Sequence, residues 1–177
     1  MYYLFIFPAV ASILLNRRLY QAYSNLTLQN SSLVLCQFKS SCLNKLEVLP
    51  SWNCSNLITE SPCLRGSWIG IICDSSGVIS INITNRFLNC SIPSSFGFLV
   101  NLTHISMSNN FLVGTLPSTI GNLKKLNFLD ISNNYLRGFI PTTVGMMTNL
   151  RTLGLSLNKF SSSIPSAIGK HIIFINP

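Results

Sequence analysis

Apolar and polar residues alternate over short stretches that recur from residue 78 onward. Each stretch places two apolar side chains two residues apart, with a polar or small residue between them, as in Ile105 and Met107, Leu129 and Ile131, and Leu153 and Leu155. A period of two indicates a strand with one buried face. The segments align without gaps at a constant 24-residue spacing, beginning at Val78, Leu102, Leu126 and Leu150. The pattern therefore predicts four 24-residue repeats, each with one short strand.

Asparagine, proline and glycine recur in phase with the strands. An asparagine follows each of the later strands, at Asn110, Asn134 and Asn158. Its amide can donate and accept hydrogen bonds where the chain turns, so we expect these three side chains to form a ladder from coil to coil. Arg86 takes this place in the first repeat, directly after Asn85, and we expect that coil to be irregular. The return path carries prolines that fix φ and glycines that permit a bend, namely Pro93, Pro117, Pro141 and Pro165, and Gly97, Gly121, Gly145 and Gly169.

Repeats of this length cannot bury a face alone and must stack on one another. The sequence thus predicts an α/β solenoid, a right-handed superhelix with parallel strands on its concave face. We expect a signal peptide over residues 1–24, an N-terminal cap over 25–77, four repeats over 78–173 and a truncated fifth repeat over 174–177. The amphipathic segment from about Ser31 to Leu49, with Trp52 or Trp68, would cover the first coil.

The repeat LxxLxLxxNxLxGxIPxxIGxLxx resembles the plant-specific class of leucine-rich repeats, found in receptor-like kinases, receptor-like proteins and polygalacturonase-inhibiting proteins. The preceding segment resembles the plant N-terminal cap of that family, through Leu33-Val-Leu, Phe38-Lys39-Ser40, Ser51-Trp52-Asn53, Trp68-x-Gly70 and Cys73-Asp74. The resemblance implies a leucine-rich-repeat superhelix and a Cys63–Cys73 disulfide bond. The pairing of Cys36, Cys42, Cys54 and Cys90 stays open.

Cysteines and glycosylation sequons point to the secretory pathway. All six cysteines lie in the first 90 residues, which fits a disulfide-bonded cap. Six Asn-x-Ser/Thr sequons occur, at Asn25, Asn30, Asn53, Asn82, Asn89 and Asn101. The apolar residues 1–15 are too few to span a bilayer and fit a secretory signal. We expect a secreted or cell-surface chain, at the plasma membrane if it is part of a longer receptor, and no transmembrane span after the signal.

The charge pattern and the acidic residues argue against nucleic-acid binding and catalysis. The net charge is +8, but the basic residues are scattered, so no nucleic-acid partner is expected. The four acidic residues are spread along the chain, at Glu47, Glu60, Asp74 and Asp130. No Walker loop, Gly-x-Gly-x-x-Gly, kinase motif or set of metal ligands is present. We expect neither an enzyme nor a cofactor or metal site.

The strand face is the candidate binding surface. The residues that alternate with the buried ones should point to solvent on the concave side, namely Ser80, Asn82, Thr84, His104, Ser106, Ser108, Phe128, Asp130, Ser132, Thr152, Gly154 and Ser156. Among them His104, Phe128 and Asp130 could form a recognition patch for a peptide or a basic partner. The alternative is that they are ordinary solvent-facing residues. A glycan on Asn82 would lie on the same face.

Three functions remain open at this point. The resemblance implies an extracellular recognition module, part of a receptor-like kinase or protein, that binds a peptide, glycan or protein ligand and an LRR co-receptor. The alternative is a secreted inhibitor of cell-wall-degrading hydrolases, and a degenerate product without function is a third hypothesis. The apolar run Ile172–Ile175 would leave the last coil uncovered, which favours a fragment of a longer receptor.

Overall fold

The computed structural model describes residues 31–43, 49–55, 62–63, 68–161, 163–169 and 172–175. These residues belong to one compact unit, Ser31–Pro177. The expected signal peptide and the sequons at Asn25 and Asn30 lie outside the described residues.

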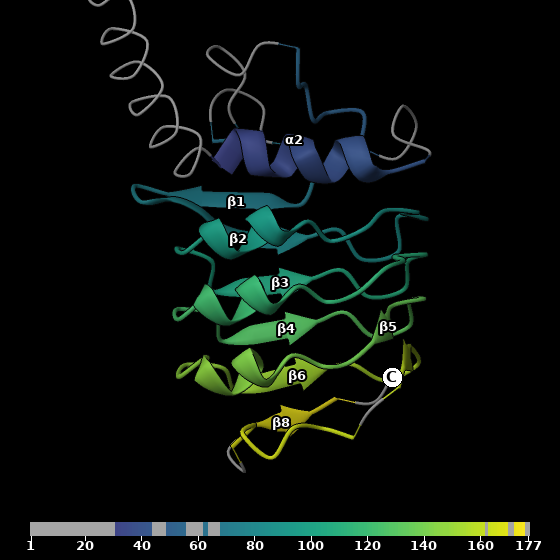
Figure 1. Cartoon of the computed structure of the whole chain (residues 1–177). Helices are drawn as coiled ribbons and strands as arrows, with labels where there is room; N and C mark the ends of the chain where they lie inside the picture. Colours follow the sequence, from purple (N-terminus) through teal and green to yellow (C-terminus); the bar gives the residue numbers. More distant parts are fainter. Residues whose placement is uncertain are drawn as a thin grey trace, which may run out of the picture. The chain divides into compact units, whose positions relative to one another are not determined.

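The unit is a stack of coils whose strands form one sheet (Figure 1). The sheet has the order β1-β2-β3-β4-β6-β8. The hairpin of β1 (Ile71–Asp74) and β2 (Gly77–Asn82) is antiparallel. All later neighbours are parallel, and they are β3 (His104–Ser106), β4 (Phe128–Asp130), β6 (Thr152–Gly154) and β8 (Ile173–Phe174).

The register of the parallel strands follows the sequence period until the last coil. Ser80 lies opposite His104, His104 opposite Phe128, and Phe128 opposite Thr152, each pair separated by one full repeat. This register aligns one fully buried row through the interior, made of Ile81, Ile105, Leu129 and Leu153. Stacking therefore buries the apolar face of each strand against the strands of the neighbouring coils, which a single strand could not do alone.

The fifth strand does not start where the period predicts. Thr152 pairs with Ile173, which lies 21 residues later, whereas the earlier pairs lie 24 residues apart. The last coil is therefore shorter than the others. The strand β8 begins at Ile173, one residue before the position at which the fifth repeat was expected to start, and the bounds of that repeat stay a prediction. A strict period would set Pro177 opposite Leu153, and proline has no N–H to donate across the ladder.

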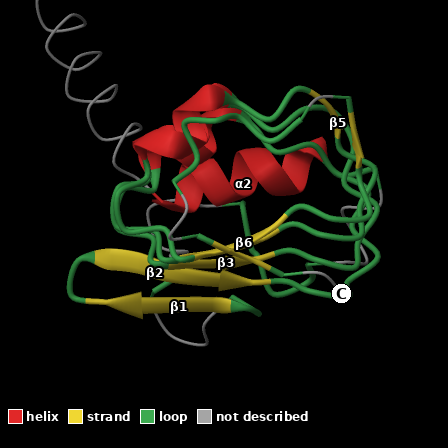
Figure 2. Ribbon diagram, turned by 90° about the horizontal axis from the view of Figure 1, so that it is seen from below, coloured by secondary structure: helices red, strands yellow, loops and turns green. Residues whose placement is uncertain are grey.

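The return path carries short 3-10 helices on the side of the coil opposite the strands (Figure 2). They are η1 (Ser94–Phe98), η2 (Ser118–Asn122) and η3 (Thr142–Met146). Each begins after one of the recurring prolines, whose φ lies between -74 and -61°. The prolines thus hold the backbone extended directly before the helix.

The recurring glycines in these helices serve a different purpose from the expected bend. Gly97, Gly121 and Gly145 are not among the residues with positive φ. Instead, a Cβ on Gly121 would overlap the carbonyl oxygen of Thr143 in the next coil, and Gly97 and Gly145 are equally close to their next coils. Glycine is needed here because adjacent coils approach through their backbones.

The turns that follow the strands lie on a third side of the stack. A second, two-stranded sheet forms on this side. That sheet pairs β5 (Arg137–Gly138) with β7 (Lys159–Phe160). Just before it, one residue per coil takes a positive φ between 51 and 56°, at Asn85, Asn109, Asn133 and Leu157. Asparagine tolerates this left-handed conformation better than most residues. In the first coil Phe87 also has a positive φ, so that coil is irregular beside Arg86, as expected.

The recurring asparagines form hydrogen bonds between coils. Asn110 accepts from the backbone N–H of Arg86 and Leu88 in the preceding coil, at 2.9 and 3.0 Å. Its Nδ2 donates to the carbonyl groups of Ile83, Met107 and Ser108. Asn134 and Asn158 make the same kind of contact one and two coils later. These buried or half-buried amides satisfy the backbone where the strands end.

Helix α2 (Ser31–Ser41) covers the first coil. Phe38 is fully buried beneath the helix, and its ring lies 5.4 Å from that of Phe96 in η1 and 6.2 Å from that of Trp52. Trp52 in turn stacks on Trp68 at 5.4 Å, so both candidate tryptophans are buried against the end of the stack. Lys39 donates to the carbonyl oxygens of Leu49 and Trp52, which ties the segment after the helix to it.

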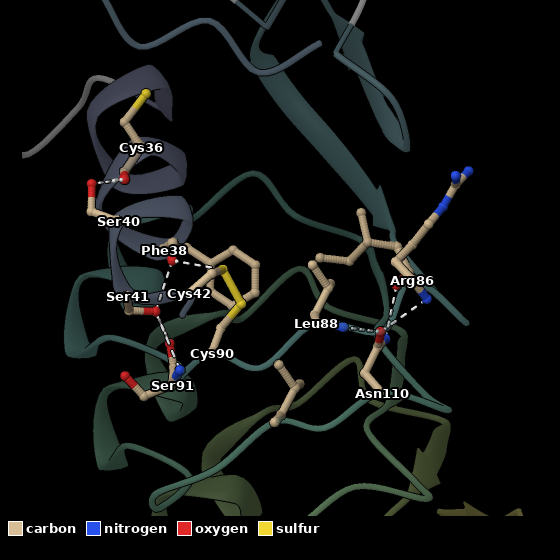
Figure 3. The surroundings of a disulfide bond; sticks show 12 residues. Cys36, Phe38, Ser40, Ser41, Cys42, Arg86, Leu88, Cys90, Ser91 and Asn110 are labelled. Atoms are coloured by element: carbon tan, nitrogen blue, oxygen red, sulfur yellow. Dashed lines mark hydrogen bonds between the residues drawn. A yellow bond between two sulfur atoms is a disulfide. The ribbon is translucent and has the colours of Figure 1, made fainter. Parts of the chain in front are cut away.

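Three disulfide bonds hold this region together. One is Cys63–Cys73, the pairing that the resemblance implied. The others are Cys36–Cys54 and Cys42–Cys90. Cys90 stands where Gly114 and Gly138 stand in later coils, and it carries the link from α2 to the return path of the first coil (Figure 3).

Candidate functional site

The parallel register gathers the predicted strand-face residues into rows. One row contains Ser80, His104, Phe128 and Thr152, and the next contains Asn82, Ser106, Asp130 and Gly154. Thr84, Ser108, Ser132 and Ser156 follow at the same 24-residue offsets directly after the strands. Thr84 and Ser106 share a hydrogen bond of 2.7 Å between their hydroxyl groups.

Several of these side chains are not exposed to solvent as expected. Ser80, Ser106, Ser108, Asp130 and Ser132 are all buried. Strands in a sheet lie about 4.8 Å apart, so a short side chain is shielded by larger neighbours in the coils on either side. The exposed or half-exposed members are Asn82, Thr84, His104, Phe128, Thr152 and Ser156.

His104 and Phe128 form an aromatic platform across β3 and β4. Their ring centroids are 4.3 Å apart and the two planes differ by 9°. Both side chains are half-buried. Desolvation lowers the pKa of His104 below its ordinary value of 6.5, and the charge of Asp130 opposes this shift without reversing it. The platform is therefore largely neutral at neutral pH.

Asp130 is withdrawn from this platform. Its Oδ1 accepts hydrogen bonds from the backbone N–H and the hydroxyl group of Ser132, at 3.0 and 2.6 Å. The carboxylate occupies space that a side chain on Gly154 would need. With 9% of its surface accessible, Asp130 offers little to a ligand. The expected solvent exposure of Asp130 is thus not found, and its part in a recognition patch with His104 and Phe128 stays a prediction.

A polar hollow of about 420 Å³ opens beside the platform, at the start of the strands. It is lined by Thr103, His104, Lys125, Asn127, Asn149 and Arg151, and we call it the strand-face hollow. Lys125 donates to Asn101 Oδ1 at 2.8 Å, which orients its ammonium group. Two cations and two amides suit a ligand carboxylate, and the platform suits an apolar or planar group next to it.

The larger surface feature is one that the sequence reasoning missed. A groove of about 830 Å³, the edge groove, lies along the turns after the strands, lined in part by the rings of Phe87, Phe111 and Tyr135. These three residues recur at 24-residue intervals, so the period could have revealed them. Phe111 and Tyr135 directly follow the ladder residues Asn110 and Asn134, and Phe87 follows Arg86, which takes the same place in the first repeat.

Within the described part of the chain, no cluster of metal-binding side chains occurs. No helix there has the length and apolarity that a membrane span requires.

Known proteins resemble the chain in sequence. Residues 100–160 match a family model described as leucine rich repeat. Over 81 residues the chain is 42% identical to an LRR receptor-like serine/threonine-protein kinase of Arabidopsis thaliana, a match that covers 45% of this chain and 10% of that protein.

Solved structures resemble the fold. PEPR1 in its complex with AtPEP1 shares 31% identity and a TM-score of 0.69 over 77% of this chain and 19% of that chain. The BIR2 ectodomain from Arabidopsis thaliana shares 29% identity and a TM-score of 0.65 over 78% of this chain and 74% of that chain. Arabidopsis HAESA, solved with the peptide hormone IDA and the co-receptor SERK1, shares 28% identity and a TM-score of 0.53 over 77% and 26%.

Over residues 100–160 the chain carries leucine-rich repeats, and it is similar in sequence and fold to plant leucine-rich-repeat receptors. Its fold is the leucine-rich-repeat solenoid of receptor ectodomains. This leucine-rich-repeat chain spans about a tenth of the length of the kinase that it matches. Its three disulfide bonds and its receptor-type relatives place it outside the cell, either secreted or at the cell surface.

The sequons of this leucine-rich-repeat chain differ in accessibility. Asn53 and Asn82 are exposed, whereas Asn89 and Asn101 are half-buried. Asn101 donates through its Nδ2 to the carbonyl group of Ser76 at 2.6 Å and accepts from Lys125 at 2.8 Å, so a glycan on Nδ2 would disturb the first of these contacts. Glycosylation at the four described sequons stays a prediction.

The lowered pKa of His104 predicts a pH effect on stability. Above the ordinary histidine pKa of 6.5, the folded and unfolded states are both neutral at this residue. As the pH falls below that value, the unfolded state takes up its proton first, so unfolding becomes more favourable until the folded state is protonated too. We expect the free energy of unfolding to fall more between pH 7.5 and pH 5 (about a histidine's titration range) in the wild type than in His104→Gln.

Urea unfolding of both proteins at several pH values would measure this difference. We expect a small effect, since solvent screens the half-exposed ring. Parallel pH profiles for the two proteins would show that His104 protonates equally easily in both states.

Proposed function

We propose that this chain is the recognition part of a plant leucine-rich-repeat receptor and that its strand face binds a peptide ligand. The observation that carries the proposal is the His104–Phe128 stack beside a hollow containing two cations. The likeness to PEPR1 in complex with AtPEP1 and to HAESA in complex with IDA supports a peptide as the class of ligand. The named relatives are receptor-type proteins, which favours this function over an inhibitor of hydrolases.

The chemistry of the surface defines the peptide. Lys125 and Arg151 favour a carboxylate, from an acidic side chain or from a C-terminus. The half-exposed Phe128 favours an apolar group next to that carboxylate. With Asp130 withdrawn, the strand-face hollow suits an acidic ligand better than a basic one.

Further features belong to the same proposal. The coils would wind as a right-handed superhelix of four repeats over 78–173, three of 24 residues and a shorter last one, beneath a cap over 25–77. Three successive strand pairs, each offset by one full repeat, support this reading. HAESA was solved with a co-receptor, which supports a leucine-rich-repeat co-receptor as a second partner. The function is binding, without a catalytic step of its own.

Selection from a displayed library of random peptides tests the ligand. We expect wild-type protein to enrich peptides that combine an acidic residue or a free C-terminus with an apolar residue. Their affinity should fall about tenfold or more in the double variant Phe128→Ala/Arg151→Gln, since each change removes one of two complementary contacts.

The double variant Phe139→Ala/Lys124→Gln is the matched control, because it removes an exposed ring and an exposed cation that line neither the strand-face hollow nor the edge groove. The enriched peptides should bind this control as tightly as the wild type. Peptides that bind all three proteins equally, or a selection without enrichment, would contradict the strand face as the ligand site.

A further inference from the structure

A row of exposed aromatic rings runs from coil to coil along the edge groove. Phe87, Phe111 and Tyr135 are 64, 42 and 46% exposed. The ring centroids of Phe87 and Phe111 are 6.1 Å apart, and those of Phe111 and Tyr135 are 6.0 Å apart. Lys159 ends the row, with its ammonium group 4.9 Å from the centre of the Tyr135 ring. Rings in contact across three coils make a continuous apolar strip.

The backbone beneath the row is already paired. The N–H groups of Phe111 and Tyr135 donate to Leu88 and Leu112 in the preceding coils, at 2.9 and 2.8 Å. Lys159 donates in the same way to Leu136 at 2.7 Å. These bonds hold the rings in place, so little ordering is needed when a ligand binds. Because these backbone N–H groups are already bonded, a ligand in the groove binds to side chains and does not add another strand to the sheet.

Amide side chains also line the edge groove. The positive-φ asparagines Asn85, Asn109 and Asn133 line it and are exposed. Asn133 donates to the amide oxygen of Asn109 at 2.7 Å, so these side chains are ordered along the row as well. Ordered amides beside an apolar strip can pair with the peptide groups of a bound chain.

The charge around the groove is positive. Arg86 adjoins Phe87 in the chain, and Arg137 lies opposite Lys159 in the two-stranded sheet. All three cations are exposed. The two acidic residues among the described positions are Asp74 in β1 and Asp130 in β4, and neither lines the edge groove. The groove therefore favours an anionic partner.

We propose that the edge groove binds an extended segment of a partner protein in which apolar and acidic residues alternate. Side chains on one face of an extended chain lie about 6.7 Å apart, close to the spacing of the rings. Alternate apolar side chains can thus contact successive rings, while the acidic residues between them meet Arg86, Arg137 and Lys159. The segment would cross the coils at a site separate from the strand-face hollow.

A fluorescent peptide of alternating leucine and glutamate tests the proposal by its polarisation. We expect saturable binding to the wild type, and a loss of about tenfold or more in affinity in Phe111→Ser/Tyr135→Ser. Arg137→Gln/Lys159→Gln should also weaken binding and make it less dependent on salt. A peptide of alternating serine and glutamate should bind at least about tenfold more weakly than the leucine peptide.

The controls separate this site from the strand face. Phe139→Ser removes a ring that is 74% exposed and outside the groove, and it should bind normally. Far-UV circular dichroism spectra would show that the groove variants are folded. The variant Arg137→Gln/Lys159→Gln tests the charges separately, because it leaves all three rings in place.

Three results would overturn the proposal. They are no binding of the leucine peptide, binding that Phe128→Ala/Arg151→Gln abolishes instead, and tighter, ring-dependent binding of an acidic oligosaccharide. Because the strand-face variant and the groove variants differ, failure here leaves the peptide ligand of the strand face untouched.

Discussion

Replacing Asn110 by alanine should lower the free energy of unfolding by about 4 kcal/mol, since each buried polar group left without a partner costs about 1–3 kcal/mol. Asn110 is buried and makes five hydrogen bonds to backbone groups of two coils. Alanine would leave two N–H groups and three carbonyl groups without this partner. Chemical denaturation followed by circular dichroism would measure the loss.

Two variants define the role of the Asn110 side chain. Asn122→Ala, at an exposed position of η2, should change stability by less than about 0.5 kcal/mol. Asn110→Asp keeps the acceptor but loses the donor and buries a carboxylate, so it should be destabilising as well. A loss below about 1 kcal/mol for Asn110→Ala would mean that water replaces the amide in full.

The second large effect is expected from the disulfide bond that joins α2 to the first coil. Its cysteines are 48 residues apart, whereas those of Cys63–Cys73 are 10 apart. In the chain-entropy model the longer loop gives about 4 kcal/mol of stabilisation and the shorter about 2.7 kcal/mol. The double variant Cys42→Ala/Cys90→Ala should therefore lose more stability than Cys63→Ala/Cys73→Ala.

The local contacts strengthen this expectation. Cys42 and Cys90 are both buried, and Ser41 Oγ donates to the carbonyl group of Ser91 at 2.9 Å beside them (Figure 3). Without the bond, the helix is still held by the Cys36–Cys54 disulfide, by these contacts and by its apolar face. Guanidinium unfolding without reductant would compare the two double variants. Equal losses, or a larger loss for Cys63→Ala/Cys73→Ala, would show that loop length does not determine the contribution.

Much of the coil was predictable because its causes are local and repeated. The alternation around Ile105 and Leu129 identified the strands, and the phase of Asn110 with its equivalents indicated hydrogen bonds between coils. Both inferences depend on one residue meeting its own equivalent in the next repeat. The last coil departs from this logic. There the apolar residues Ile172 and Phe174 precede Pro177, and the strand forms earlier than the period predicts.

The candidate site was predictable only in part. The period correctly set His104 opposite Phe128, but it could not show that Asp130 would fold back onto Ser132 into the space left by Gly154. The pairing of Cys42 with Cys90 was equally beyond reach, since six cysteines allow about 15 arrangements and no spacing rule selects among them. The edge groove was overlooked although Phe87, Phe111 and Tyr135 recur in phase.

By itself the sequence determined which side chains are repeated, and thereby the strands, their register and the buried rows. It could do so because residues that lie one repeat apart in the sequence are in contact in a stack of equivalent coils. The tertiary structure alone decided which repeated side chains reach solvent, which cysteines meet and where two hollows open. These properties depend on how closely adjacent coils approach and on how the cap lies against them, and no single repeat contains that information.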